Sequence, residues 1–172
     1  MNQFDLQHSR FASTAERLEA TDRRHPGFPK EAAAVVRMIK LIHKLTVDHG
    51  NDTLRAHGLS YPEYNVLMMI DSSPDGALSP SLIGEAAGEK SANVTRLTQQ
   101  LVDKGLIQRQ PSPQDRRSTL LCLTQAGHAS IAAFLPDIWA VLKGYVRDLD
   151  RTEQAVLRHL LTKLLHGVEQ TL

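Results

Sequence analysis

The feature that most constrains the fold is a run of helix and strand signals between residues 79 and 123. Ser79-Pro80 sets a capping hydroxyl before a proline at the first helical position, where the missing N–H costs nothing. This first helix is predicted to end at Gly88, and a second helix is predicted over residues 91–104. Two short helices joined by a tight turn that contains glycine predict a helix-turn-helix.

Two strand-like runs follow, at residues 106–109 and 118–123. The polar turn between them contains Pro111, Pro113 and two arginines. Two short strands around a basic tip predict a β-hairpin, in other words a wing.

Longer helical patterns lie on both sides of this region. Apolar residues follow helical spacing over residues 31–56. Ser60 and Glu63 have the spacing of a capping box, which predicts a helix over residues 61–71. After Thr124 the chain is predicted to be helical in two pieces.

The first C-terminal helix is predicted over residues 125–149, with a kink at Pro136. Its predicted buried residues are Ile131, Leu135, Ile138, Trp139, Leu142 and Val146. The second is predicted to begin at Asp150 or Thr152. Its leucine-rich stripe consists of Val156, Leu157, Leu160, Leu161, Leu164, Leu165 and Val168.

These patterns predict how a chain of 172 residues is organised. The fold class is mainly α with a small β-hairpin wing: a winged helix-turn-helix with N- and C-terminal helices that form a dimerisation region. Residues 1–30, which end in a proline-rich link, form an N-terminal arm, and residues 58–123 form the winged region. Residues 31–57 and 124–172 form the dimerisation region, because so small a winged region cannot bury two apolar helix faces. We therefore expect a homodimer.

The charge is concentrated in the winged region. The whole chain carries 20 Lys and Arg against 19 Asp and Glu, a net charge of only +1. Residues 90–117 nevertheless carry a net charge of +4, whereas residues 124–172 are neutral. A DNA phosphate backbone favours such a distribution, so residues 58–123 are expected to bind double-stranded DNA.

Several function classes lack the residues that they need. We find no Gly-x-Gly-x-x-Gly, Walker or Gly-x-Ser-x-Gly motif, so neither an enzyme nor a cofactor site is expected. No histidine pair has the i, i+4 spacing of two metal ligands on one helix. The single cysteine, Cys122, lies among leucines and is expected to be a buried structural thiol. With no signal peptide or membrane segment in the sequence, we expect a cytoplasmic protein.

At this level of detail the sequence resembles the MarR family of winged-helix transcriptional regulators. The resemblance extends from about residue 31 to the end of the chain. It is carried by Leu78–Gly84, Ser91–Leu97, Leu101–Arg109, Asp115–Ser118 and Leu123–Gly127. Within the family the chain is most similar to the MprA/EmrR type, which regulates multidrug efflux. The segments behind this assignment are Arg24–Pro29, Ser91–Arg96 and Leu135-Pro136.

A recognition helix from Ser91 to Asp103 is expected to enter the major groove by its N-terminal part. Four of its polar side chains lie at positions that the core does not need, namely Ser91, Asn93, Thr95 and Arg96. Asn93 suits adenine and Arg96 suits guanine, with phosphate binding by either as the alternative. Ser81 is placed to donate to a phosphate.

The wing tip completes the expected DNA contacts. The family pattern implies that Asp115 orients Arg117 into the minor groove, whose negative potential favours a guanidinium. Arg116 is then a phosphate contact or a solvated neighbour. The alternative for the Asp115–Arg117 pair is an ordinary salt bridge within a turn.

The resemblance also implies a pocket for a small aromatic or phenolic anion that releases a repressor from DNA. The candidate residues are His43, Tyr61, Tyr64, Met68 and Trp139, and the alternative for each is a place in the core. Three other functions stay open. The protein could be a helical protein–protein adaptor, a redox-responsive regulator of the same fold or a metal-responsive regulator of the same fold. The activity of an adaptor would survive the joint substitution of Arg96→Ala and Arg117→Ala.

Overall fold

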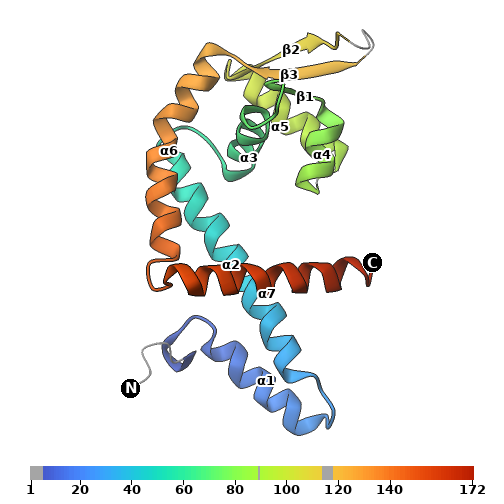
Figure 1. Ribbon diagram of the computed structural model, residues 1–172, viewed down its shortest axis with the longest axis vertical. Coiled ribbons are helices and arrows are strands. Elements are labelled where there is room, and N and C mark those ends of the chain that lie inside the picture. The colour runs from blue at the N-terminus through green and yellow to red at the C-terminus, as the bar shows by residue number, and fades with distance from the viewer. Residues whose placement is uncertain (1–5, 89, 114–117) are drawn as a thin grey trace. The chain divides into compact units, whose positions relative to one another are not determined.

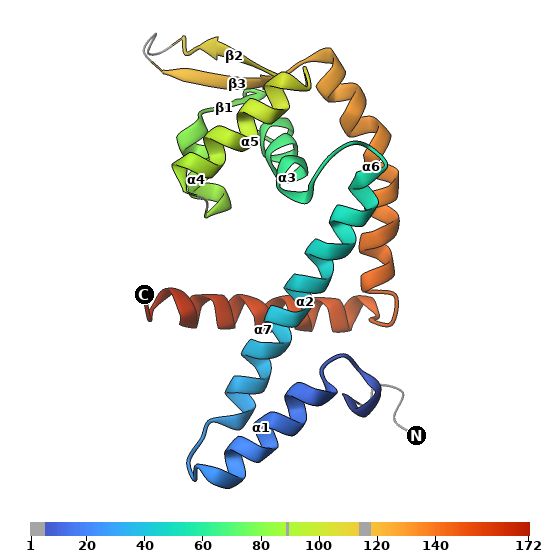
Figure 2. The same ribbon diagram turned by 180° about the vertical axis from the view of Figure 1, so that it is seen from behind.

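The computed structural model of the protein describes residues 6–88, 90–113 and 118–172, and the chain forms two compact units, Met1–Asp52 and Thr53–Leu172 (Figure 1; Figure 2 from behind). The elements in chain order are a 3-10 turn Leu6–His8 (η1), α1 Ala12–Arg24, α2 Lys30–Arg55, α3 Tyr61–Asp71, β1 Ala77–Leu78, α4 Pro80–Ala87, α5 Ser91–Asp103, β2 Ile107–Pro111, β3 Thr119–Leu123, α6 Gln125–Tyr145 and α7 Arg151–Glu169.

The second unit contains a winged helix-turn-helix. Its antiparallel sheet has the order β1-β3-β2, and α3, α4 and α5 lie on one side of it (Figures 1 and 2). Fully buried side chains from the helices and the sheet form one core, among them Leu67, Ile83, Leu101, Leu121 and Phe134. The predicted mainly α winged fold is confirmed, with a third strand in the sheet. That strand, β1, has only two residues, too few for a recognisable alternation.

The helix boundaries follow from capping residues in the sequence. Ser60 accepts a hydrogen bond from the Glu63 N–H and forms the predicted capping box. Ser79 caps α4, which ends at Gly88 in the left-handed conformation, with φ of 63°. Thr124 caps α6 through the Gly127 N–H. These predicted caps are confirmed, because each depends only on residues within one helical turn.

The long apolar face of α6 departs from the prediction. Ile131 and Ile138 are buried, as is Phe134, which the prediction omitted. Trp139 and Leu142, predicted to be buried, are 54% and 52% exposed. The first half of the apolar stripe of α6 packs on the core. The stripe continues along the helix beyond the edge of the core, so its second half is in contact with solvent.

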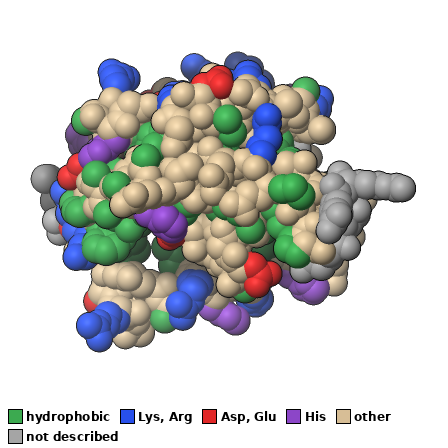
Figure 3. All heavy atoms as spheres, turned by 90° about the horizontal axis from the view of Figure 1, so that it is seen from above, with side chains coloured by type: hydrophobic (Ala, Val, Ile, Leu, Met, Phe, Trp, Pro, Cys, Tyr) green, Lys and Arg blue, Asp and Glu red, His purple; other side chains and the backbone are tan. Residues whose placement is uncertain are grey.

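Helix α7 shows the same exposure along its whole length. None of its residues 151–169, all of which the structure describes, is buried. Its apolar side chains that are more than two-fifths exposed are Val156, Leu157, Leu160, Leu161, Leu165 and Val168. In the space-filling view, hydrophobic side chains reach the surface in several places between charged ones (Figure 3). Neither α7 nor any other described helix combines the length and hydropathy that crossing a bilayer requires.

The first unit consists of η1, α1 and most of α2. Phe11 and Leu18 are buried within it. Lys30, at the start of α2, lies 3.0 Å from a carboxylate oxygen of Glu19 and 3.7 Å from one of Asp22. The hydrogen bond and charge of Glu19 raise the pKa of Lys30 above its usual value. The N-terminal segment therefore contains a helix that is tied to α2 by an ion pair.

Gly127 marks a close approach of α6 to the turn before β2. A Cβ atom at this position would lie well inside van der Waals contact with the Leu106 carbonyl oxygen, which is backbone and cannot turn aside. We therefore expect Gly127→Ala to lower the free energy of unfolding by about 3 kcal/mol or more. Urea denaturation provides the measurement.

Gly144 on the same helix is the matched control. A Cβ atom there would meet nothing within 4 Å, so Gly144→Ala is expected to leave stability unchanged or to raise it by up to about 1 kcal/mol. Equal stability of the two variants would contradict the packing described for Gly127.

Candidate nucleic-acid interface

Helix α5 has one face in the core and one face in solvent. Its inner face holds Val94, Leu97, Thr98 and Leu101, each at most 3% exposed. These positions recur at helical spacing, so the residues between them point outward. Thr98 is the polar member of the buried face, and its hydroxyl donates to the Thr95 carbonyl.

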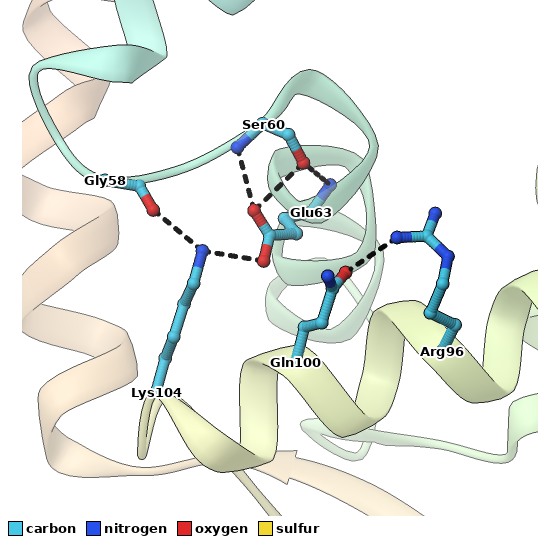
Figure 4. A network of polar contacts seen from close by, with 6 residues as sticks. All are labelled: Gly58, Ser60, Glu63, Arg96, Gln100 and Lys104. Carbon is cyan, nitrogen blue, oxygen red and sulfur yellow. Dashed lines mark hydrogen bonds and ion pairs between the residues drawn. The ribbon is translucent and has the colours of Figure 1, made fainter.

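The outward face presents an exposed guanidinium. Arg96 donates from Nη2 to Asn93 Oδ1 at 2.8 Å and from Nη1 to Gln100 Oε1 at 3.0 Å (Figure 4 shows the contact with Gln100). Both amide partners are neutral, so they orient the guanidinium without neutralising its charge. The sequence prediction included Asn93 and Arg96 but not Gln100. The spacing of i+4 from Arg96 was the available signal for it.

The other predicted helical residues lie at the start of α4 and α5. Ser91 is exposed as the first residue of α5. The Thr95 hydroxyl donates to the Ser91 carbonyl at 2.9 Å. Ser81 is exposed near the start of α4, with its hydroxyl 3.0 Å from that of Ser79. The structure thus leaves Ser81, Ser91 and Thr95 at the surface of the helix-turn-helix.

The wing is a hairpin of β2 and β3. The Ser112 N–H donates to the Ser118 carbonyl at 2.8 Å and extends the pairing beyond the strands. Arg109 is exposed on β2. Asp115, Arg116 and Arg117 lie outside the described residues, so their expected contacts remain predictions.

Lys104 differs from the other described basic residues of this region because its ammonium group contacts groups of α3 and of the turn before it. Its ammonium group lies 2.7 Å from Glu63 Oε1 and 2.7 Å from the Gly58 carbonyl oxygen (Figure 4). The net charge of residues 90–117, which was expected to face DNA, includes that of Lys104, but the Lys104 charge is directed toward α3. Besides Lys104, which is also exposed, the exposed cations among the described residues of this region are Lys90, Arg96 and Arg109.

The Glu63 carboxylate is buried, with only 4% of the residue exposed. Burial acts to raise the pKa of Glu63, but Lys104 and the N–H and hydroxyl of Ser60 together lower it below its usual value of 4.5. The distances from Glu63 Oε2 to the Ser60 nitrogen and hydroxyl oxygen are 2.8 and 2.9 Å. The charged form of Glu63 is therefore the form that the fold favours.

This lowered pKa predicts a pH dependence of stability. Folding favours the deprotonated carboxylate, so its contribution is complete above the unfolded-state pKa of about 4.5 and is lost as the pH falls through the lower folded-state pKa. Glu63→Gln is expected to lower the free energy of unfolding at pH 7 by about 1–3 kcal/mol and to flatten its dependence on pH in the acidic range. Thermal unfolding from pH 3 to 7 measures both effects. Parallel profiles for the two proteins would contradict this account.

The candidate effector residues differ in burial. Tyr61 and Tyr64 are half-buried with ring centroids 5.5 Å apart, and Tyr64 meets the buried Phe134 edge-on at 5.4 Å. Burial raises the pKa of Tyr64, so its hydroxyl stays protonated at neutral pH. Met68, also half-buried, packs against the same core, whereas Trp139 is exposed. His43 is an exposed residue of the first unit.

The sequence also predicted a buried Cys122 thiol and gave no reason to expect a metal site. The Cys122 thiol is free and half-buried, which corrects the expectation of full burial. Cys122 pairs with Ala77 and Gln108 in the sheet and, together with them, points away from the buried Leu121 side. Among the described residues, no group of three His, Cys, Asp or Glu side chains is arranged to hold a metal ion.

Comparisons with known proteins agree with this architecture. A family model described as MarR family matches residues 57–118. The chain is 28% identical over 162 residues to the transcriptional repressor MprA of Escherichia coli, with 94% of this chain and 92% of that protein covered. A MarR family transcriptional regulator of Streptomyces coelicolor, Sco5413, is 25% identical with a TM-score of 0.69, covering 84% of this chain and 98% of that one.

The fold is also that of a MarR mutant from Escherichia coli crystallised with operator DNA. That structure is 24% identical with a TM-score of 0.72, over 80% of this chain and 98% of the other. These relatives are transcriptional regulators and not enzymes. Residues 57–118 thus match the MarR family model, and the chain as a whole is similar in sequence and in fold to regulators of that family.

Proposed function

We propose that the protein is a transcriptional repressor that binds a pseudo-palindromic operator as a homodimer. The observation that carries the proposal is the two-sided character of α5. Its buried side fixes the helix on the core, and its exposed side presents Arg96, held by the neutral amides of Asn93 and Gln100. An oriented guanidinium on an exposed helix suits bidentate recognition of guanine in the major groove.

The cations around α5 support the same function. Lys90 precedes the first turn of the helix and Arg109 lies on the wing, both exposed. Cations at these places suit contacts with phosphates on either side of a groove. The expected reach of Arg117 into the minor groove, with Asp115 as its orienting partner, extends this surface at the wing tip.

The unpartnered apolar faces support a homodimer. Trp139 and Leu142 on α6 and the leucine-rich face of α7 are exposed within one chain. These faces lie within the dimerisation region that the sequence predicts over residues 31–57 and 124–172. A second copy of the chain would cover them. A two-fold dimer places its two recognition helices about 34 Å apart, one turn of DNA, which matches half-sites with centres about 10 base pairs apart.

We further propose that a small aromatic anion releases the protein from DNA. The half-buried rings of Tyr61 and Tyr64 beside Phe134 offer an aromatic surface, on which the Tyr64 hydroxyl is protonated at neutral pH because burial raises its pKa. A ligand of this kind shifts the protein away from the operator only if it binds the DNA-free conformation more tightly than the DNA-bound one.

DNase protection of the DNA upstream of the protein's own gene tests the function. At moderate salt we expect protection of a single pseudo-palindrome, weakened when salt is raised and lost on addition of benzoate as a simple aromatic anion. The absence of a protected site would contradict the proposal of DNA binding. Protection that benzoate does not alter would contradict only the proposed class of effector.

A further inference from the structure

We propose that Lys104 is a positioning residue for operator recognition, which fixes the direction of α5 without contacting DNA. The inference rests on the proposed DNA-binding function and concerns a contact at the opposite end of the helix from the DNA-facing residues. Lys104 is the residue that caps the C-terminal end of α5, whereas Ser91, Asn93 and Arg96 lie in its first two turns.

The contact joins α5 to two other parts of the winged region. The Lys104 ammonium is bound at once by a backbone oxygen, that of Gly58 in the turn before α3, and by the Glu63 carboxylate within α3 (Figure 4). The helix dipole reinforces this arrangement, because a cation is favoured at a C-terminal helix end. The ammonium group of Lys104 therefore ties the end of α5 to the turn before α3 and to α3 itself, more than 40 positions earlier in the sequence.

Both acceptors are themselves held in place. Ser60 fixes the second oxygen of Glu63 through its N–H and hydroxyl. The turn that contains Gly58 is fastened on its other side, where a ring nitrogen of His57 lies 2.9 Å from Asp137 Oδ2 of α6. Lys104 thus binds a rigid acceptor pair and not a flexible loop.

The other contacts of α5 with the body of the unit are mainly apolar. Val94, Leu97 and Leu101 pack against neighbours in the core, and such packing is not directional. Hydrogen bonds, in contrast, weaken steeply when their angle changes. The Lys104 contact adds to this packing a polar tie between the C-terminal end of α5 and the turn before α3.

The length of α5 makes its direction matter. With 13 residues it is about 20 Å long, so a tilt of about 5° at the Lys104 end displaces the first turn by nearly 2 Å. A bidentate contact to a base tolerates far less than this. A phosphate contact made by a long, flexible side chain such as that of Lys90 tolerates a larger displacement. Loss of the Lys104 contact should therefore weaken specific binding and spare non-specific binding.

The test compares Lys104→Met with the wild-type protein on the duplex that the footprint identifies and on an unrelated duplex. The methionine keeps an aliphatic stem but has no donor. We expect specific affinity to fall about tenfold or more, which is the loss of one good base contact, with non-specific affinity within about twofold of wild type. Lys104→Arg, which keeps the charge and donates to both acceptors, should recover most of the affinity.

The salt dependence separates positioning from a direct phosphate contact. We expect the slope of log affinity against log salt to be the same for Lys104→Met and wild type. A slope smaller by about 0.9 would identify a lost phosphate contact and overturn the inference. Lys90→Met serves as the comparison in which that decrease is expected, and Lys40→Met, at an exposed position of α2, controls for a change in net charge.

All affinities are measured well below each variant's unfolding temperature, so that a loss of stability is not mistaken for a loss of positioning. If Lys104→Met does not fold, Lys104→Gln, which is polar but uncharged and has a shorter side chain than lysine, replaces it with the same expected loss of specificity. Specific affinity within twofold of wild type in the folded variant would overturn the inference. Failure of the wild-type protein itself to bind any duplex would instead refute the proposed function.

Discussion

Deletion of α7 is expected to leave the protein monomeric and to lower its affinity for a palindromic operator by about 10²–10⁴-fold, since a monomer loses the benefit of two linked half-sites. The reason is that the apolar face of α7 has no buried residue in a single chain. Because no residue of α7 is buried, its removal should leave the winged core folded. Analytical ultracentrifugation and operator titration measure the two effects, and circular dichroism at 222 nm verifies the fold.

A pair of point variants on α7 makes this prediction sharper. Leu161→Asp places a charge on the apolar face, whereas Lys163→Asp changes the charge on the opposite, polar face. We expect the first to produce monomers and the second to remain dimeric. A monomeric Leu161→Asp protein that retains full operator affinity would refute the dimeric mode of binding.

Arg96→Ala is expected to lower operator affinity by about 1–3 kcal/mol and to relax specificity at one base pair of each half-site. Arg96 is exposed and its two partners within α5 are neutral, so its removal leaves no buried charge behind and should barely change stability. Titrations against a set of operators with single base changes measure both the affinity and the relaxed position.

Gln99→Ala on the same helix is the matched control. Gln99 is exposed and donates to Asp103 at 2.7 Å, near the C-terminal end of α5. We expect its substitution to leave operator affinity within about twofold of wild type. An Arg96→Ala protein with unchanged affinity and specificity would exclude α5 as the reading helix.

The local structure was largely predictable from the sequence because it depends on short-range chemistry. The Ser60–Glu63 capping box, Ser79-Pro80 and Gly88 each define a helix end through contacts within one turn. The resulting order of elements was sufficient to predict the winged fold. Arg96 and Asn93 were identified because their polar side chains lie near the start of the helix, at positions that its apolar stripe does not need.

The contacts between distant segments were not predictable in this way. Nothing in the spacing of Lys104 and Glu63, 41 positions apart, indicates that they form an ion pair, so Lys104 was interpreted as a DNA-facing charge. Trp139 follows the helical stripe of α6, but periodicity does not reveal where the core ends. Both errors concern what lies opposite a residue, which depends on tertiary packing.

The most direct test of the central account is selection of bound duplexes from a randomised DNA pool, followed by measurement of the stoichiometry of the selected complex. We predict an enriched inverted repeat with half-site centres about 10 base pairs apart, bound by two copies of the chain. Enrichment of no motif, or of a single asymmetric site bound by one copy, would contradict it.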